Sequence, residues 1–414
     1  MEPRVRRTFP ALEPVRVFAV LSVAAAAALL VTACARGPAG DSTAAGSGAA
    51  ANRSGRTGGR VESGRGRTPE GAVIRLRTHH VVDTQGIGLE VFSVLVPAEW
   101  ETQGGISWPL RNPAQPAEVA FRAFDPRTPD AMEVFPARAC SYNAANLGLF
   151  PVGSLYMGAE VREPMVARQA LKTMVIARTR GNATNLRVTN EADVPELQAI
   201  ARQAAAMELR QGVSGAQAEV TAAKVRVEYD LGGQTVEEEF FGTVTAYSFP
   251  AGMFGQRTFI WTPDNLFSFR AAKGRLDSQA RLYETMVKSF QVNLQWLNTY
   301  VQVVRALTQQ QIQRIHQIGE FSRQLSRQSS EISDMMMQAY ENRQAAYDRI
   351  STNFSQTIRG VDEWIDPASG TRTELPTGYD NAWVNGLGDY VMSESPSYNP
   401  NIGSNQNWQR LERK

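Results

Sequence analysis

Residues 219–249, EVTAAKVRVEYDLGGQTVEEEFFGTVTAYSF, decide the fold of this chain. Two long runs of strand-forming residues, 219–229 and 235–249, flank Asp230-Leu231-Gly232-Gly233, a sequence suited to the turn of a β-hairpin. Strands joined by so short a turn pair in opposite directions. The stretch therefore predicts an antiparallel sheet.

The surrounding sequence supplies the other elements of an α+β fold. After the hairpin, we predict a second pair of strands, 257–261 and 266–270, around the turn residues Pro263-Asp264-Asn265. Five upstream stretches have strand-like composition: 73–78, 89–96, 106–110, 118–124 and 132–142. Three stretches have apolar residues at helical spacing: 163–178, 193–210 and 276–289. We expect an antiparallel sheet with packed helices over 70–292.

Two short motifs in this region resemble a known family. Residues 94–100, VLVPAEW, resemble the opening of PsbP-like domains, and 286–290, MVKSF, resemble the end of their last helix. The resemblance covers about 73–292, and the chain departs from it by its size and by the extra helices between Glu163 and Arg210. Such domains are mostly accessory and binding modules, so the resemblance implies a non-catalytic role.

Residues 293–356 predict one long helix. The stretch has no proline and only one glycine, Gly319. Its apolar residues are three and four positions apart, as in a coiled coil. An apolar stripe stabilises a helix by packing. We expect it to pack on the preceding domain, on a hairpin folded back near Gly319, or on a second copy of the chain.

The C-terminal sequence predicts a small β-meander, a run of short antiparallel strands, over 357–395, followed by a polar tail over 396–414. Four aromatic residues gather in the meander: Trp364, Tyr379, Trp383 and Tyr390. They form either an interaction surface or the packing that fixes the strands to the rest of the molecule.

The N-terminus resembles the signal peptide of bacterial lipoproteins. Arginines precede an uncharged apolar run that begins at Val17 and ends in Val31-Thr32-Ala33-Cys34. In that family the signal, here 1–33, is removed and the cysteine is lipidated, which makes Cys34 the predicted lipid attachment site. The alternatives are an ordinary signal peptide with a chance cysteine and an uncleaved anchor. Residues 34–69 are rich in Gly, Ala, Ser and Arg and predict a flexible tether.

This leader indicates a location in the cell envelope, with the protein facing the periplasm or the exterior. Ala35 in the second mature position resembles lipoproteins that reach the outer membrane in Gram-negative cells. Removing the leader takes away four arginines and two glutamates, so the rest of the chain carries equal numbers of basic and acidic residues. We therefore expect the membrane as a partner, an envelope protein or a second copy as a further one, and no nucleic acid.

Residues suited to catalysis or metal binding are scarce. The adjacent His79 and His80 point to opposite faces of a strand, and His316 has no His or Cys at helical spacing, so we expect no metal and no cofactor. Cys140 is predicted to be a buried structural thiol. Glu237-Glu238-Glu239 is predicted to be a solvated strand edge that discourages edge pairing.

Two classes of function agree with these features. The first is a lipid-anchored binding or structural module of the envelope without catalytic activity. The alternative is an envelope hydrolase whose site the sequence does not disclose. Few reactive side chains and many interaction features favour the first class.

Overall fold

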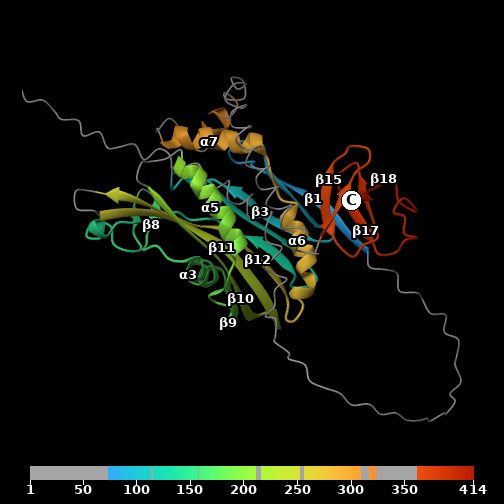
Figure 1. The fold of residues 1–414 in the computed structure, drawn as a ribbon, viewed down its shortest axis with the longest axis horizontal. Helices are drawn as coiled ribbons and strands as arrows, with labels where there is room; N and C mark the ends of the chain where they lie inside the picture. Colours follow the sequence, from blue (N-terminus) through green and yellow to red (C-terminus); the bar gives the residue numbers. More distant parts are fainter. Residues whose placement is uncertain are drawn as a thin grey trace, which may run out of the picture.

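The computed structural model describes residues 73–112, 115–156, 158–210, 216–251, 256–308, 317–321, 323 and 361–414. A ten-stranded sheet forms its centre (Figure 1). Seven strands follow in the order β3-β4-β5-β12-β11-β10-β9, while β6 pairs with β12, and β8 links β6 to β7. The bounds of the first seven of these strands in the sequence are β3 (Glu101–Ser107), β4 (Glu118–Phe124), β5 (Ala131–Val134), β6 (Cys140–Tyr142), β7 (Leu155–Tyr156), β8 (Ala159–Val161) and β9 (Thr184–Asp193).

The predicted hairpin is confirmed and lies in the middle of this sheet. β10 (Gln217–Leu231) pairs with β11 (Gln234–Ala251) along its whole length. Gly232 and Gly233 form the turn with φ angles of 59° and 84°. Both values lie in the left-handed region that a type I′ turn requires, which glycine adopts without steric cost.

The second predicted pair of strands is wrong, because one strand, β12 (Gln256–Ala272), runs through the expected turn. Its pairing with β11 shifts by one residue near Thr243, and Asn265 there has a φ of 52°. Asn265 donates a side-chain hydrogen bond of 2.9 Å to the Thr243 hydroxyl, which itself donates to the Asp264 carbonyl at 3.1 Å. These contacts hold the turn-forming residues as a bulge within a continuous strand.

A helical segment, 167–180, covers one face of the sheet. It consists of α3 (Ala167–Ala170), the π-helical η2 (Leu171–Ile176) and α4 (Ala177–Arg180), and it confirms the predicted helix from Ala167 onward. In Figure 1 it lies below the long strands. The core under it includes Leu171, Met174, Val175, Val225, Phe240 and Trp261.

The opposite face packs against three helices and a second sheet. The helices are α5 (Pro195–Arg210), α6 (Ala280–Lys288) and α7 (Leu294–Thr308), and the short 3-10 turns are η1 (Ala144–Asn146) and η3 (Asp277–Gln279). The largest core of the molecule lies here and includes Phe92, Val96, Phe121, Phe241, Phe269, Tyr283, Trp296 and Tyr300.

The second sheet brings the two ends of the described chain together. Its strand order is β13-β2-β1-β17-β16-β18, and all neighbouring strands are antiparallel. In this order β1 lies between β2, which follows it in sequence, and β17, near the C-terminal end of the described chain. The bounds are β13 (Gln291–Val292), β2 (Glu90–Pro97), β1 (Val73–Val82), β17 (Tyr390–Ser393), β16 (Asn381–Asn385) and β18 (Trp408–Arg410). A third sheet, β15-β14-β19, comprises β15 (Arg372–Pro376), β14 (Val361–Ile365) and β19 (Glu412–Arg413).

Asp83 fixes α7 to the second sheet from the end of β1. Its carboxylate is fully buried and accepts four hydrogen bonds. Oδ1 accepts from the Gly86 amide at 2.8 Å and the Trp108 indole at 2.9 Å, and Oδ2 accepts from the Ile87 amide at 2.9 Å and the Trp296 indole at 3.1 Å. All four donors are neutral N–H groups.

The predicted fold class is wrong, because the described chain is mostly β and contains no long helix. Its longest helix is α5, with 16 residues. The described part of 293–356 contains α7 over Leu294–Thr308 and the helical residues 317–321 and 323. The rest of that prediction lies outside the described residues. Trp296, Tyr300 and Val304 bury the apolar face of α7 in the main core, so its partner is the folded domain.

The short strands predicted within 357–395 are present from Val361 onward, but they do not form one meander, because they divide between two sheets. β16 and β17 extend the sheet of β1, and β14 and β15 belong to the third sheet. The polar tail over 396–414 supplies β18 and β19, which complete these two sheets. A few short strands lack a core of their own, and these strands obtain one by packing Trp364, Leu375, Met392 and Leu411 against Leu76 and Leu95.

Candidate functional site

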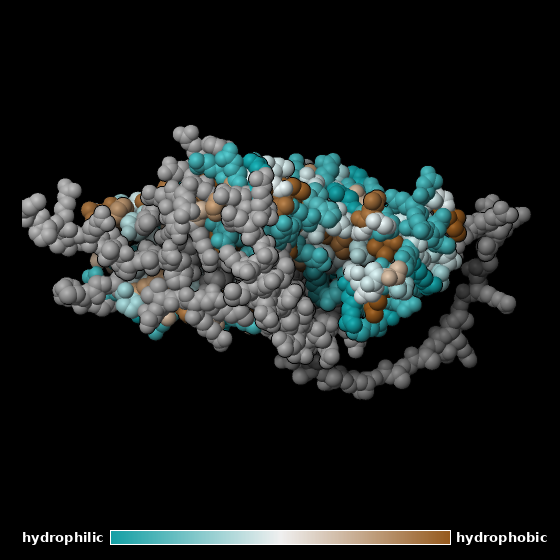
Figure 2. All heavy atoms as spheres, turned by 90° about the horizontal axis from the view of Figure 1, so that it is seen from above, coloured by the Kyte–Doolittle hydropathy of each residue, from teal (hydrophilic) through white to brown (hydrophobic). Residues whose placement is uncertain are grey.

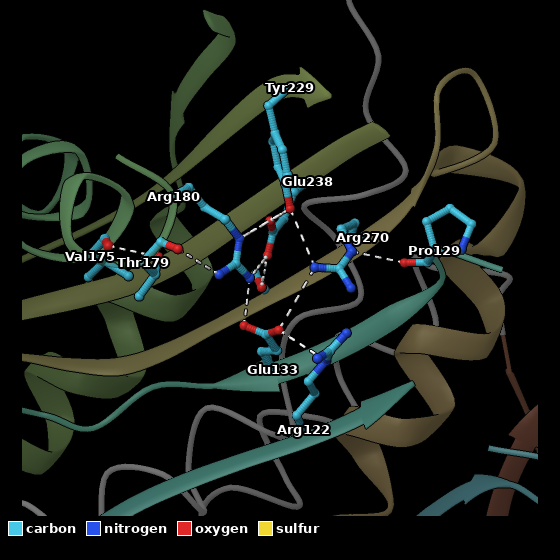
Figure 3. A network of polar contacts seen from close by, with 10 residues as sticks. Arg122, Pro129, Glu133, Val175, Thr179, Arg180, Tyr229, Glu238 and Arg270 are labelled. Atoms are coloured by element: carbon cyan, nitrogen blue, oxygen red, sulfur yellow. Dashed lines mark hydrogen bonds and ion pairs between the residues drawn. The ribbon is translucent and has the colours of Figure 1, made fainter. Parts of the chain in front are cut away.

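The densest polar cluster of the described chain crosses the face of the central sheet that the 167–180 segment covers (Figure 3). Pairing places Arg122 of β4 opposite Glu133 of β5, and Glu238 of β11 opposite Arg270 of β12. Side chains alternate between the two faces of a strand, so these four lie on one face. Phe121, Met132 and Phe269, each adjacent to one of them in sequence, belong to the main core on the other face. Arg180, at the end of α4, completes the cluster.

Glu238 is the centre of this network and is fully buried. Arg180 donates two hydrogen bonds to its carboxylate, from Nε at 2.8 Å and from Nη2 at 2.9 Å. The hydroxyls of Tyr229 and Ser268 each donate one more at 2.6 Å. A buried carboxylate is expensive unless it is paired and hydrogen-bonded, and four donors meet that requirement.

Glu133 links the remaining guanidinium groups. It accepts a 2.6 Å hydrogen bond from Arg180, and its other oxygen lies 3.2 Å from Nε of Arg122 and 3.9 Å from Nη1 of Arg270. Arg270 also donates to the carbonyl of Pro129 at 2.9 Å. Three guanidinium groups and two carboxylates therefore join four strands of the sheet to the end of α4.

The pKa shifts of these residues reflect their burial and the charges of their partners in the network. Burial lowers the pKa of Arg180, but the hydrogen bonds and charge of Glu238 outweigh it and raise that pKa above its ordinary value. Burial, and then the negative charge of Glu238, raises the pKa of Tyr229 to about 12. Burial and the charge of Arg270 lower the pKa of Arg122. A general base needs a free lone pair facing a substrate, whereas Glu238 is saturated with donors.

The sequence-based interpretation of Glu237-Glu238-Glu239 as a solvated edge is therefore wrong. β11 is a central strand, and Glu238 and Glu239 are both buried. Glu239 faces the opposite side, where Lys224 and Arg226 of β10 lie 3.2 and 3.3 Å from its carboxylate. The signal that could have revealed this is the presence of basic residues in the flanking strands at positions that oppose the glutamates.

Cys140 and the neighbouring pair His79 and His80 make contacts within the fold. Cys140 is buried, which confirms the prediction, and burial followed by the charge of Glu160 raises its pKa to about 12. His79 stacks on Phe121 with ring centroids 5.6 Å apart, whereas Nδ1 of His80 lies 2.9 Å from a Glu90 oxygen. Within the described residues, no group of three His, Cys, Asp or Glu side chains is arranged to hold a metal ion.

The predicted aromatic cluster divides into two buried and two half-buried residues. Trp364 is 2% exposed and Trp383 is 5% exposed, and both pack in the C-terminal strands. Tyr390 shares a 3.1 Å hydrogen bond with Thr373, and the Tyr379 carbonyl accepts a hydrogen bond from Arg413 of β19. These placements favour the account in which the rings hold the strands together; a direct role in binding stays a prediction.

Cys34, the predicted lipid attachment site, lies outside the described residues, as does His316, for which no site was predicted. No helix in the described part of the chain has the length and apolar character needed to cross a membrane.

Comparison with known proteins gives a weak structural resemblance. No family model and no curated protein matches the chain. The solution structure of cyanobacterial PsbP (CyanoP) from Synechocystis sp. PCC 6803 is 11% identical, covers 52% of this chain and 93% of its own, and has a TM-score of 0.22. LpqN of Mycobacterium tuberculosis, involved in cell envelope biogenesis, is 9% identical, covers 53% of this chain and 91% of its own, and has a TM-score of 0.20.

Proposed function

We propose that this chain is a lipid-anchored module of the cell envelope that binds or supports other envelope components and is not a catalyst. The observation that carries the proposal is the leader, in which arginines and an uncharged apolar run end in Val31-Thr32-Ala33-Cys34. Acylation of Cys34 would hold the domain at the membrane through the 34–69 tether, whose arginines suit anionic headgroups. The domain would face the periplasm or the exterior, on the outer membrane in a Gram-negative cell.

The state of the polar groups supports binding over catalysis. Glu238 and Asp83 each accept four hydrogen bonds from protein donors. The Cys140 thiol is buried with a pKa of about 12 and is therefore a poor source of thiolate. The titratable groups that converge in this fold thus serve its architecture.

The test expresses the full chain and its Cys34→Ser variant in a bacterial host and measures mass and membrane partitioning. We expect the parent to fractionate with membranes and to have the mass of an acylated, processed chain, while the variant is released or accumulates as the precursor. Cys140→Ser is the matched control, because it removes the other cysteine and should leave processing unchanged. Identical mass and partitioning of the parent and Cys34→Ser would overturn the anchoring proposal.

A further inference from the structure

Residues 147–156, LGLFPVGSLY, form an apolar loop at one end of the central sheet, which follows η1 and ends in the two-residue strand β7. Leu149 is 80% exposed, Leu155 62% and Val152 60%. In Figure 1 this loop lies at the left end, beside β8, and Figure 2 shows apolar surface at the same end of the molecule. Single exposed apolar residues are ordinary, but three within seven positions of one loop form a patch.

The loop has a fixed conformation that keeps these side chains in solvent. The amide of Gly153 donates to the Val161 carbonyl and the amide of Val161 donates to the Ser154 carbonyl, both at 2.8 Å. The rings of Phe150 and Tyr156 meet edge to face with centroids 4.8 Å apart. The loop is thus held at its base against β8, and its apolar side chains project outward.

Basic residues surround the base of the loop. Arg138 and Arg111 are exposed, and the backbone of Arg111 lies against Gly158, where an added Cβ would come 2.4 Å from the Arg111 carbonyl oxygen. Arg162 and Arg178 share the single carboxylate of Glu160. With the exposed Glu163, the charged residues named here are four arginines and two glutamates, and their net charge is positive.

We propose that the 147–156 loop inserts its apolar side chains into the surface of a membrane that contains anionic lipids. Apolar side chains that project beyond a basic base match the acyl-chain boundary and the anionic headgroups above it. A protein partner would need its own apolar pocket, whereas a lipid surface accepts a projecting loop of this kind and also complements the arginines. The inference shares the envelope location of the proposed function but does not require acylation of Cys34.

Hydrogen exchange of the full chain, with and without vesicles, tests the contact locally. With vesicles of phosphatidylcholine and phosphatidylglycerol, we expect amides in 147–156 to exchange about tenfold more slowly, because insertion removes them from water. Vesicles of phosphatidylcholine alone should protect the loop less. The Cys34→Ser chain should show the same protection, which separates failure of this proposal from failure of the anchoring proposal.

The triple variant Leu149→Gln, Val152→Gln, Leu155→Gln should lose the protection while keeping the melting temperature of the parent, because these side chains are exposed. The matched control is Leu387→Gln with Ile402→Gln, which replaces side chains exposed by 74% and 79% in turns of the C-terminal region and should leave loop protection unchanged. No slowing with anionic vesicles, or slowing that survives the triple variant, would overturn the proposal. Protection that appears without vesicles as protein concentration rises would overturn it in favour of a second copy of the chain.

Discussion

Asp83 and Glu238 are both fully buried carboxylates with four hydrogen bonds, but their donors differ in kind. Asp83 receives only neutral N–H groups, two from the backbone of its own turn and two from indoles. Glu238 receives two bonds from a guanidinium group and two from hydroxyls. The comparison shows two ways in which this fold stabilises a buried carboxylate. One uses neutral N–H donors from the local turn and from two distant tryptophans, and the other uses a guanidinium group of opposite charge.

The two arrangements also differ in what they connect. The Asp83 site fixes α7 to the turn after β1, since Trp296 begins that helix and Trp108 follows β3. The Glu238 network joins neighbouring strands of one sheet to α4, and Glu133 gives Arg180 a second carboxylate. If Glu238 is lost, Arg180 therefore still has the carboxylate of Glu133 as a partner. Among the residues that the structure describes, the donors that bind Asp83 have no second carboxylate in this site.

The largest effect is expected for Asp83→Ala. The change leaves two amides and two indoles buried without an acceptor, and each such group costs about 1–3 kcal/mol. We expect the free energy of unfolding, measured by denaturant titration, to fall by about 5 kcal/mol, a sum over four such groups after partial relaxation. Asp83→Asn keeps one carbonyl oxygen and should lose roughly half as much. A loss below about 1 kcal/mol for Asp83→Ala would show that water replaces the carboxylate.

A smaller loss is expected for Glu238→Gln. Removing one partner of a buried ion pair typically costs about 3–5 kcal/mol, and the retained amide oxygen and Glu133 keep this change near the lower value. Glu237→Gln is the matched control on the same strand, because its side chain is only half-buried, and it should change stability by less than about 0.5 kcal/mol. Equal effects at the two positions would contradict the central role of Glu238.

Glu284 on α6 extends the comparison to a buried carboxylate with too few partners. Lys288 lies 3.4 Å away, but Glu374 of β15 shares that lysine at 2.8 Å. Burial raises the pKa of Glu284 to about 7, and the opposing effect of Lys288 is smaller. Below about pH 7 the folded state therefore favours the protonated form of Glu284.

The sign of the pH dependence follows from this shift. A folded-state pKa above the unfolded value of 4.5 stabilises the protein fully below pH 4.5, and the stabilisation is lost as pH rises through about 7. Relative to Glu284→Gln, the parent should lose on the order of 2–3 kcal/mol between pH 4.5 and 8. Unfolding free energies of the two proteins measured across this range give the difference, and parallel profiles would contradict the prediction.

The smallest effect is expected at the edge of the network. The Arg122 side chain is 36% exposed and makes one ion pair of 3.2 Å, so Arg122→Met should cost less than about 1 kcal/mol. Arg180→Met, which leaves Glu238 without its cation, should cost several times more. Chemical denaturation of both variants checks the order, and a reversed order would place the centre of the network at Glu133.

Local features of this fold could be predicted from the sequence. The turn at Gly232-Gly233 and, from Ala167 onward, the helix predicted over 163–178 depend on nearby residues, and both are confirmed. Failures arose where distant segments decide the outcome. Pro263-Asp264-Asn265 has the composition of a turn, but pairing with β11 on one side and β5 and β6 on the other keeps β12 continuous.

The candidate site shows the same limit. Glu238 in a charged run resembles a solvated residue until Arg180, 58 positions away in sequence, is brought against it by the helical segment. Trp364 resembles part of an interaction surface until Leu76 of β1 and Leu95 of β2 join it in one core. Trp383 does so until the ring of Tyr398 packs against it edge to face, with centroids 5.6 Å apart. A polar or aromatic side chain takes its role from neighbours that only the tertiary structure supplies.

The pairing of β1 with β17 has a consequence for the order in which the chain can fold. Val73 lies opposite Ser393, and the Thr78 hydroxyl donates to the carbonyl of Gly388, 310 positions away. As the chain emerges from its N-terminal side, β1 can pair with β2 early, but its other edge stays open until β17 has emerged. An open strand edge invites pairing with other chains. The emerging protein therefore has a long vulnerable interval, which ends when β17 pairs with β1.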